Sequence, residues 1–179
     1  MLQHSKASTG KKDPTDINAL CDEYLRLAYH GLRAKDKSFN ADFKTDFDET
    51  IGKINIVPQD IGRVFLNLFN NAFYAANEKL TAHRSPLTDD YKPLVSVQTK
   101  KINDKVEIVV SDNGIGFSPE FRDQVFTIFQ RLDNSDKFSG SGIGLALCRK
   151  IVTNHKGIIF AESIPGEGSQ FHIILPTEK

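Results

Sequence analysis

Four short segments of this chain concentrate residue types that can do chemistry or bind a ligand. Residues 67–72 (NLFNNA) supply amides, and residues 112–116 (DNGIG) supply a carboxylate followed by two glycines. Residues 126–129 (FTIF) are aromatic and apolar, and residues 140–145 (GSGIGL) place three glycines at the start of a predicted helix. Amides, a carboxylate and a glycine-rich helix start can recognise a base and its phosphates, so the set predicts one nucleotide pocket.

The first segment lies on the most regular predicted helix, which begins at Pro58. At about 100° per residue, Asn71 falls just outside the apolar stripe, on the flank that also carries Asn67, Tyr74 and Glu78. A half-buried amide oxygen there can bind Mg²⁺ without adding charge. The alternative is an amide at the edge of the helix that hydrogen-bonds the backbone.

The second segment ends a predicted strand. Asp112 has the same parity as Val106 and Val110, so we expect its carboxylate to point toward the buried side. There it can accept a hydrogen bond from an exocyclic amine such as adenine N6. Gly114 and Gly116 allow the backbone to turn tightly and to approach a ligand closely. The alternative is an ordinary turn, for which Asp-Asn-Gly is a common sequence.

The fourth segment, from Gly140 to Gly144, opens a predicted helix whose N-terminus would favour phosphate. A flexible joint and a dinucleotide-type loop are the alternatives. The dinucleotide loop requires a strand directly before the glycines, and a polar stretch precedes them here. The Gly-Lys-Ser/Thr ending of a P-loop is absent.

Aromatic and basic residues frame this polar stretch. Phe126 and Phe129 lie on its near side, where they most simply anchor it in the core, with direct ligand contact as the alternative. Arg131 and Lys137 lie within it and can reach phosphates if the stretch closes over a ligand. Residues of this kind are more often solvated, so both readings stay open.

Apolar periodicity predicts the elements that position these segments. The predicted helices are 15–34 (capped by Asp13 or Thr15), a long one from Pro58, a short one within 118–129, and 142–155, which Gly157 ends. The predicted strands are two within 38–57 joined around Gly52, then 94–100 and 106–111 joined by a turn at Asn103-Asp104, and finally 158–162 and 170–175. Helices and hairpins without a regular strand–helix–strand repeat predict an α/β (α+β) two-layer sandwich. In it, three main helices pack on one face of a mixed, mostly antiparallel sheet.

Length and composition narrow the class of protein. The 179 residues carry 23 basic and 23 acidic side chains, which favours neither nucleic acid nor an anionic membrane as the main partner. Cys21 and Cys148 are isolated, so we expect reduced thiols in a cytoplasmic protein. No apolar run approaches the roughly 20 residues that span a bilayer, and the polar start does not resemble a signal peptide.

Taken as a set, the four segments resemble the N, G1, F and G2 boxes of the catalytic ATP-binding domain of sensor histidine kinases. That domain belongs to the group that also includes gyrase, the heat-shock chaperone and the mismatch-repair ATPase. The ending at 162–176 is similar to the family's closing hairpin, so the resemblance covers residues 15–176. It implies a catalytic domain at 15–179. It also implies a linker, or the tail of a dimerisation helix, at 1–14, in a parent protein that could be membrane-anchored.

The resemblance assigns a role to each matched position. Asn71 would ligate Mg²⁺, Asp112 would recognise adenine, Gly114 and Gly116 would shape the base pocket, and residues 130–141 would form the ATP lid. The positions implied to bind ATP are Asn67, Asn71, Tyr74, Asp112, Gly114, Ile115, Gly116, Phe117, Phe129, Arg131, Gly140, Ser141, Gly142, Ile143, Gly144, Leu145 and Ser169.

Two positions depart from the usual pattern of the family's kinases, and a third separates this chain from the family's ATPases. Tyr74 stands where many kinases have a phosphate-binding Lys, and Gln170 replaces a frequent Thr. The hydrolytic relatives carry a Glu four residues before the metal-binding Asn to activate water, and this chain has Asn67 there, which is not a base. The resemblance therefore favours a kinase over an ATPase of this group. A non-catalytic nucleotide-binding module is a further alternative, against which the complete set of motifs argues.

The phosphoacceptor is missing from this chain. None of its five histidines precedes the acidic and helical pattern of a phosphoacceptor box, so we expect no catalytic residue here and no self-labelling. The implied cofactors are ATP and Mg²⁺. The implied partners are a dimerisation and histidine-phosphotransfer domain of the same protein and a downstream response-regulator receiver domain. We expect this segment to contact neither nucleic acid nor membrane.

Overall fold

The computed structural model describes residues 10–82, 90–127 and 144–177. Six of the residues implied to bind ATP lie outside these ranges: Phe129, Arg131, Gly140, Ser141, Gly142 and Ile143. Among the described helices, none combines the length and apolar character that a membrane crossing requires.

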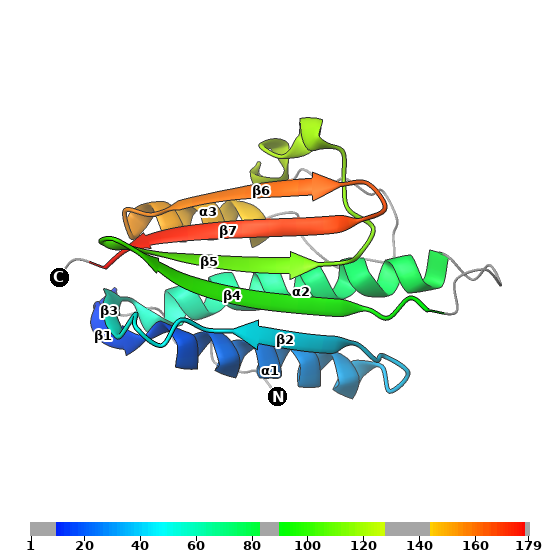
Figure 1. Cartoon of the computed structure of the whole chain (residues 1–179), viewed down its shortest axis with the longest axis horizontal. Helices are drawn as coiled ribbons and strands as arrows, with labels where there is room; N and C mark the ends of the chain where they lie inside the picture. The colour runs from blue at the N-terminus through cyan, green and yellow to red at the C-terminus, as the bar shows by residue number, and fades with distance from the viewer. Residues whose placement is uncertain (1–9, 83–89, 128–143, 178–179) are drawn as a thin grey trace.

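Five strands form one mixed sheet in the order β2-β4-β5-β7-β6 (Figure 1). Only β2 and β4 run parallel, and the other three neighbouring pairs are antiparallel. The strands are β2 (Asp42–Asp46), β4 (Leu94–Ile102), β5 (Lys105–Asp112), β6 (Ile158–Ile164) and β7 (Gly168–Pro176). The predicted hairpin about Asn103-Asp104 is confirmed, and Asn103 has the positive φ of 54° that such a tight turn uses.

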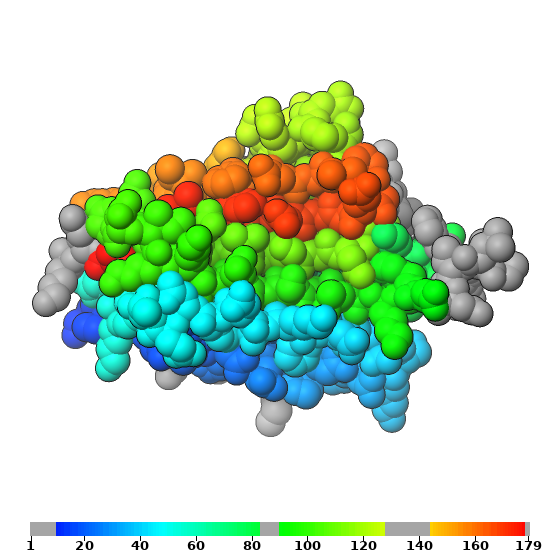
Figure 2. All heavy atoms as spheres, viewed as in Figure 1, coloured from blue at the N-terminus to red at the C-terminus, as the bar shows by residue number. Residues whose placement is uncertain are grey.

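Three helices lie behind this sheet in Figure 1: α1 (Ile17–Lys35), α2 (Pro58–Ala82) and α3 (Gly144–Asn154). This confirms the predicted sandwich with three main helices on one face. The short helix predicted within 118–129 is instead two separate 3₁₀ turns, η1 (Pro119–Phe121) and η2 (Gln124–Phe126). The opposite face of the sheet is turned toward the viewer in Figure 2, where side chains of the strands form the surface.

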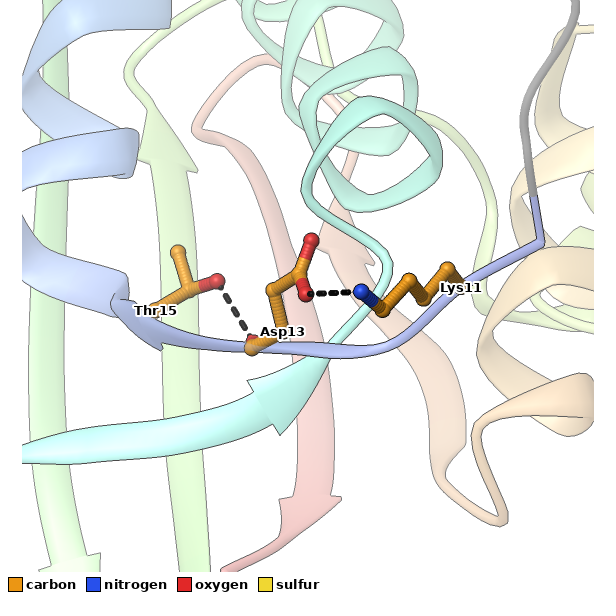
Figure 3. A network of polar contacts seen from close by, with 3 residues as sticks. All are labelled: Lys11, Asp13 and Thr15. Carbon is orange, nitrogen blue, oxygen red and sulfur yellow. Dashed lines mark hydrogen bonds and ion pairs between the residues drawn. The ribbon is translucent and has the colours of Figure 1, made fainter.

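A small second sheet changes the start of α1. Residues Asp13–Asp16 form β1, which pairs antiparallel with β3 (Lys53–Ile56). Asp16, rather than the predicted Asp13 or Thr15, therefore caps α1, and its carboxylate accepts a hydrogen bond from the backbone N–H of Ala19 at 3.1 Å. Thr15 instead donates to the carbonyl of Asp13 at 2.8 Å, and Lys11 lies 4.0 Å from the carboxylate of Asp13 (Figure 3).

The predicted end of α3 also needs correction. Lys156, with φ of 59°, adopts the left-handed conformation after α3, and the N–H of Gly157 donates to the carbonyl of Val152 at 2.9 Å. Gly157 is required for a different reason. A Cβ there would lie 2.4 Å from the carbonyl oxygen of Ile174 on β7.

The core lies between the sheet and the helices. Alternate residues of β5 (Val106, Ile108 and Val110) are buried on the helix side. The apolar stripe predicted on α2 faces them, and α2 also buries Phe73. The predicted stripe consists of Ile61, Val64, Phe65, Leu68, Phe69, Ala72, Ala75 and Ala76 and does not include Phe73. The ring of Phe73 lies 5.8 Å from that of Phe39 and 5.9 Å from that of Tyr29 on α1.

Removing this ring should destabilise the fold strongly. We expect Phe73→Ala to lower the free energy of unfolding by about 3–5 kcal/mol, because it leaves a cavity at a fully buried site. Leu27→Ala on the outer side of α1, where the leucine is 55% exposed, is the control and should change it by less than about 0.5 kcal/mol. Urea unfolding measures both, and equal losses would contradict the packing described.

Candidate functional site

Asp112 ends β5 at the centre of the candidate site. Its Oδ1 accepts a hydrogen bond from the N–H of Gly114 at 2.8 Å, and the N–H of Ser169, its register partner on β7, also donates to the carboxylate. Burial raises the pKa of Asp112 to about 6, although these two donors and the nearby charge of Lys79 act to lower it. The side chain of Asp112 is only half-buried. Its carboxylate can therefore accept a hydrogen bond from a ligand in addition to those from Gly114 and Ser169.

The loop after Asp112 lies directly on the backbone of α2. A Cβ at Gly114 would lie 2.3 Å from the carbonyl carbon of Ala75, so only glycine allows this approach. The N–H of Ile115 then donates to the carbonyl oxygen of Ala75 at 3.2 Å. The helix of the first segment and the loop of the second are therefore in direct main-chain contact.

The turn between β6 and β7 closes the loop from the other side. Gly116 has φ of 63°, and a Cβ there would lie 2.1 Å from the carbonyl oxygen of Ile164. Gly168 has φ of 127°, and its Cβ would lie 1.9 Å from the carbonyl oxygen of Asp112. The N–H of Gly166 donates to the carbonyl of Ile115 at 2.7 Å. Glycine is thus required in both the loop and the turn.

Two serines, one on β6 and one on β7, form a further hydrogen-bonded contact with the main chain of Phe117. The hydroxyl oxygens of Ser163 and Ser169 lie 2.8 Å apart, and Ser163 accepts a hydrogen bond from the N–H of Phe117 at 2.8 Å. Phe117 is half-buried, with its ring centroid 6.5 Å from that of Phe171. Ser163 was not predicted as a site residue, because the closing-hairpin match at 162–176 assigns it no role.

The polar flank of α2 carries Asn67, Asn71 and Tyr74. The amide nitrogen of Asn67 donates to the carbonyl of Arg63 at 3.0 Å, and its Oδ1 lies 2.9 Å from where a Cβ of Gly144 would be. The first segment therefore meets the start of α3. Asn71 is half-buried, and so is Tyr74, whose hydroxyl oxygen is buried.

The described part of the third segment anchors in the core, as predicted. Phe126 is buried, and its ring packs edge-on to that of Phe171 with centroids 6.0 Å apart. The guanidinium of Arg149 on α3 lies 4.9 Å from the centroid of Phe126. Leu145, the last residue of the fourth segment, is partly buried against the same core.

Asn113 and Tyr91 also hold the loop after Asp112 in place, although no sequence pattern marked them. Oδ1 of Asn113 accepts from the N–H of Leu94 at 2.9 Å, and its amide nitrogen donates to the carbonyl of Lys92 at 2.8 Å. The Tyr91 hydroxyl lies 3.0 Å from the same Oδ1. Asn113 was interpreted only as a turn residue, and Tyr91 lies in a stretch predicted as surface loop, where no pattern marks it.

Because burial raises the pKa of Asp112, replacing its carboxyl group with a neutral amide should stabilise the folded state, by an amount that depends on pH. The carboxyl titrates near pH 6 when folded and near about 3.9 when unfolded, so its ionisation above this window destabilises the folded state. We expect Asp112→Asn to be more stable than the natural chain by about 1–3 kcal/mol at pH 7.5. The gain should shrink as the pH falls from 6 toward 4.

Urea unfolding across this pH range measures the gain. Asp104→Asn, in the exposed turn at the other end of β5, is the control and should change stability by less than about 0.5 kcal/mol at each pH. A loss of stability in Asp112→Asn at pH 7.5 would contradict the argument from burial.

Known proteins resemble this chain in both sequence and fold. Residues 56–179 match the family described as Histidine kinase-, DNA gyrase B-, and HSP90-like ATPase. The adaptive-response sensory kinase SasA of Synechococcus sp. (strain JA-3-3Ab) is 33% identical over 162 residues, 90% of this chain and 39% of SasA. The phytochrome-like protein Cph1 of Synechocystis sp. is 32% identical over 162 residues, 86% of this chain and 20% of Cph1. The solved mycobacterial sensor histidine kinase MprB superposes with a TM-score of 0.69 at 24% identity, over 92% of this chain and 97% of that one.

These comparisons differ in what they establish. The likeness to MprB confirms the fold. The chain spans only about a fifth of Cph1 and two fifths of SasA, so both relatives contain further segments. The family model matches more than half of the chain and identifies ATP as the nucleotide. The chain belongs to the histidine kinase-, DNA gyrase B- and HSP90-like ATPase family.

Proposed function

We propose that this chain is the ATP-binding catalytic domain of a sensor histidine kinase. It would donate the γ-phosphate of ATP to a histidine on a dimerisation and phosphotransfer domain outside the chain. The observation that carries the choice of kinase over ATPase is Asn67. This neutral amide bonds the backbone of its own helix at the position where the hydrolytic relatives carry a basic Glu.

Adenine recognition is assigned to Asp112. Its carboxylate is half-buried at the end of β5 and is held by the N–H groups of Gly114 and Ser169. An acceptor in such a site favours an exocyclic amine over a carbonyl, which would repel it. This selects adenine over guanine, whose corresponding position is a carbonyl oxygen. Gly114, Ile115 and Gly116 would line the base through their main chain, which the two glycines allow to pack against α2 and the turn between β6 and β7.

The oxygen ligands that the site offers suit a Mg²⁺ ion that is bound together with the nucleotide. Among the described residues, no group of three or more His, Cys, Asp or Glu is placed to hold a metal ion. Mg²⁺ usually keeps several waters and binds through one or two protein oxygens plus substrate phosphates. Asn71 would supply such an oxygen from α2, and the ion would neutralise phosphate charge there.

The remaining phosphate contacts are assigned to the fourth segment. The start of α3 lies against Asn67, and Leu145 packs on the core just inside this helix. Phosphates at this end would receive N–H donors and the favourable helix dipole. We assign Gly140 to Gly144 to this role, and Phe129, Arg131 and Tyr74 as further contacts to ATP.

The reaction requires little covalent chemistry from this chain. In phosphoryl transfer the protein chiefly positions the two substrates and stabilises charge. The acceptor imidazole is itself the nucleophile, so a pocket without a base suits a kinase. The partners would be the phosphotransfer domain of the same protein and, downstream, a response-regulator receiver domain, and the segment would act in the cytoplasm.

Nucleotide binding tests the assigned residues. We expect Asn71→Ala to weaken binding of ATP in Mg²⁺ by about tenfold or more, an effect that calorimetric titration measures. Asn70→Ala is the matched control, because this neighbouring asparagine is exposed and should leave affinity unchanged. Without Mg²⁺, natural chain and Asn71→Ala should bind ATP equally. A loss that persists without the metal would contradict the assignment to Mg²⁺.

Labelling with γ-³²P-ATP tests the reaction class. The chain alone should bind ATP without forming an acid-labile phosphohistidine, and it should hydrolyse ATP no faster than the Asn71→Ala variant. Label should appear on a phosphotransfer domain of the parent protein when the two are combined. Self-labelling, or hydrolysis that depends on Asn71, would contradict the proposed division of roles.

A further inference from the structure

One ammonium group joins three segments beside Asp112. Lys79, near the C-terminal end of α2, donates from Nζ to the carbonyl of Gly166 at 2.7 Å, in the turn between β6 and β7. It also donates to the carbonyl of Asn113 at 3.1 Å, directly after Asp112. The same nitrogen lies 4.8 Å from the ring centroid of Tyr91. The helix, the loop, the turn and the segment before β4 therefore meet at this side chain.

Tyr91 strengthens the same junction. Its hydroxyl lies 2.9 Å from the carbonyl of Ala76 and 3.1 Å from that of Asn113, which also accepts from Lys79. Burial, and secondarily the charge of Asp112, raises the pKa of Tyr91 to about 12. Tyr91 is therefore a neutral donor at physiological pH, and it adds no negative charge to the junction.

The positive charge of half-buried Lys79 lies close to Asp112. Within the described part of the chain, Nζ of Lys79 contacts two carbonyl oxygens and a ring face, and no carboxylate. Its positive charge is thus not neutralised by a direct ion pair and acts on Asp112, whose pKa it lowers against the effect of burial. Lys79 from α2 and the neutral N–H donors of Gly114 and Ser169 lower the pKa of Asp112. Tyr91, from the segment before β4, faces Asp112 as a neutral phenol whose own pKa the Asp112 charge raises.

We propose that Lys79 is a positioning residue for the nucleotide. It holds the loop after Asp112 against the turn between β6 and β7, and it keeps the Asp112 carboxylate charged when the base arrives. This inference rests on the proposed adenine-binding role of Asp112. It adds a requirement that the four sequence segments do not contain, since Lys79 lies outside all of them.

Three variants separate the two roles of this side chain. Lys79→Met removes both the hydrogen bonds and the charge, Lys79→Gln keeps an N–H donor without the charge, and Lys79→Arg keeps both. Lys105→Met, at the exposed opposite end of β5, is the matched control. ATP affinity is measured for each by calorimetry from pH 5.5 to 8.5. Titration of the ATP phosphates is common to all of them.

Loss of the charge should move the pH profile. In Lys79→Met and Lys79→Gln, the pH below which affinity declines should rise by roughly half a pH unit or more, since less positive charge opposes protonation of Asp112. Affinity at pH 7.5 should fall about three- to tenfold in Lys79→Met and less in Lys79→Gln. Lys79→Arg and Lys105→Met should keep the natural profile.

Two results would overturn the proposal. The first is a natural pH profile in both uncharged variants. The second is a profile that moves equally in Lys79→Arg. Either result would leave the proposed function intact provided that Asp112→Asn weakens ATP binding. If Asp112→Asn binds ATP as well as the natural chain does, the adenine assignment itself fails. The Lys79→Gln variant, which retains a donor, keeps the test valid should Lys79→Met fold poorly.

Discussion

The candidate site depends above all on the main-chain contact between the loop after Asp112 and helix α2. Gly114 places its Cα where any Cβ would collide with the backbone of Ala75, and Ile115 donates to the carbonyl of that same residue. Backbone atoms cannot move aside as a flexible side chain can. The position of the loop is thus set by the helix, and the turn between β6 and β7 fits the remaining side through Gly116 and Gly168.

This arrangement places a carboxylate where the fold disfavours its charge. The proposed recognition of adenine requires a charged Asp112, yet burial raises its pKa to about 6. Polar groups from several segments partly offset this cost: the N–H groups of Gly114 and Ser169, and the ammonium of Lys79. The packed core around α2, where Phe65, Phe69 and Phe73 are fully buried, stabilises the fold against the remaining cost of this buried charge.

Much of the fold could be predicted because its signals are local. Helix α2 follows from an apolar stripe of helical period after Pro58, and the β4–β5 hairpin follows from alternation on both sides of a two-residue turn. Strand β1 could not be predicted, because Asp13–Asp16 carries no alternation and is extended only through pairing with β3 some forty residues later. The N-cap of α1 then moved to Asp16 for the same reason.

The sequence by itself determined which chemical groups the site contains. The Asp112 carboxylate, the glycines after it and the asparagines of α2 could be named from residue type, spacing and predicted elements. Only the tertiary structure decided how these groups are held. It brought Lys79, Tyr91 and Ser163 to the loop, and it required Gly157 for contact with β7 rather than for the end of α3. Hydrogen bonds and steric contacts between segments distant in the chain depend on how helices and strands pack, and no local pattern of residues encodes those distances.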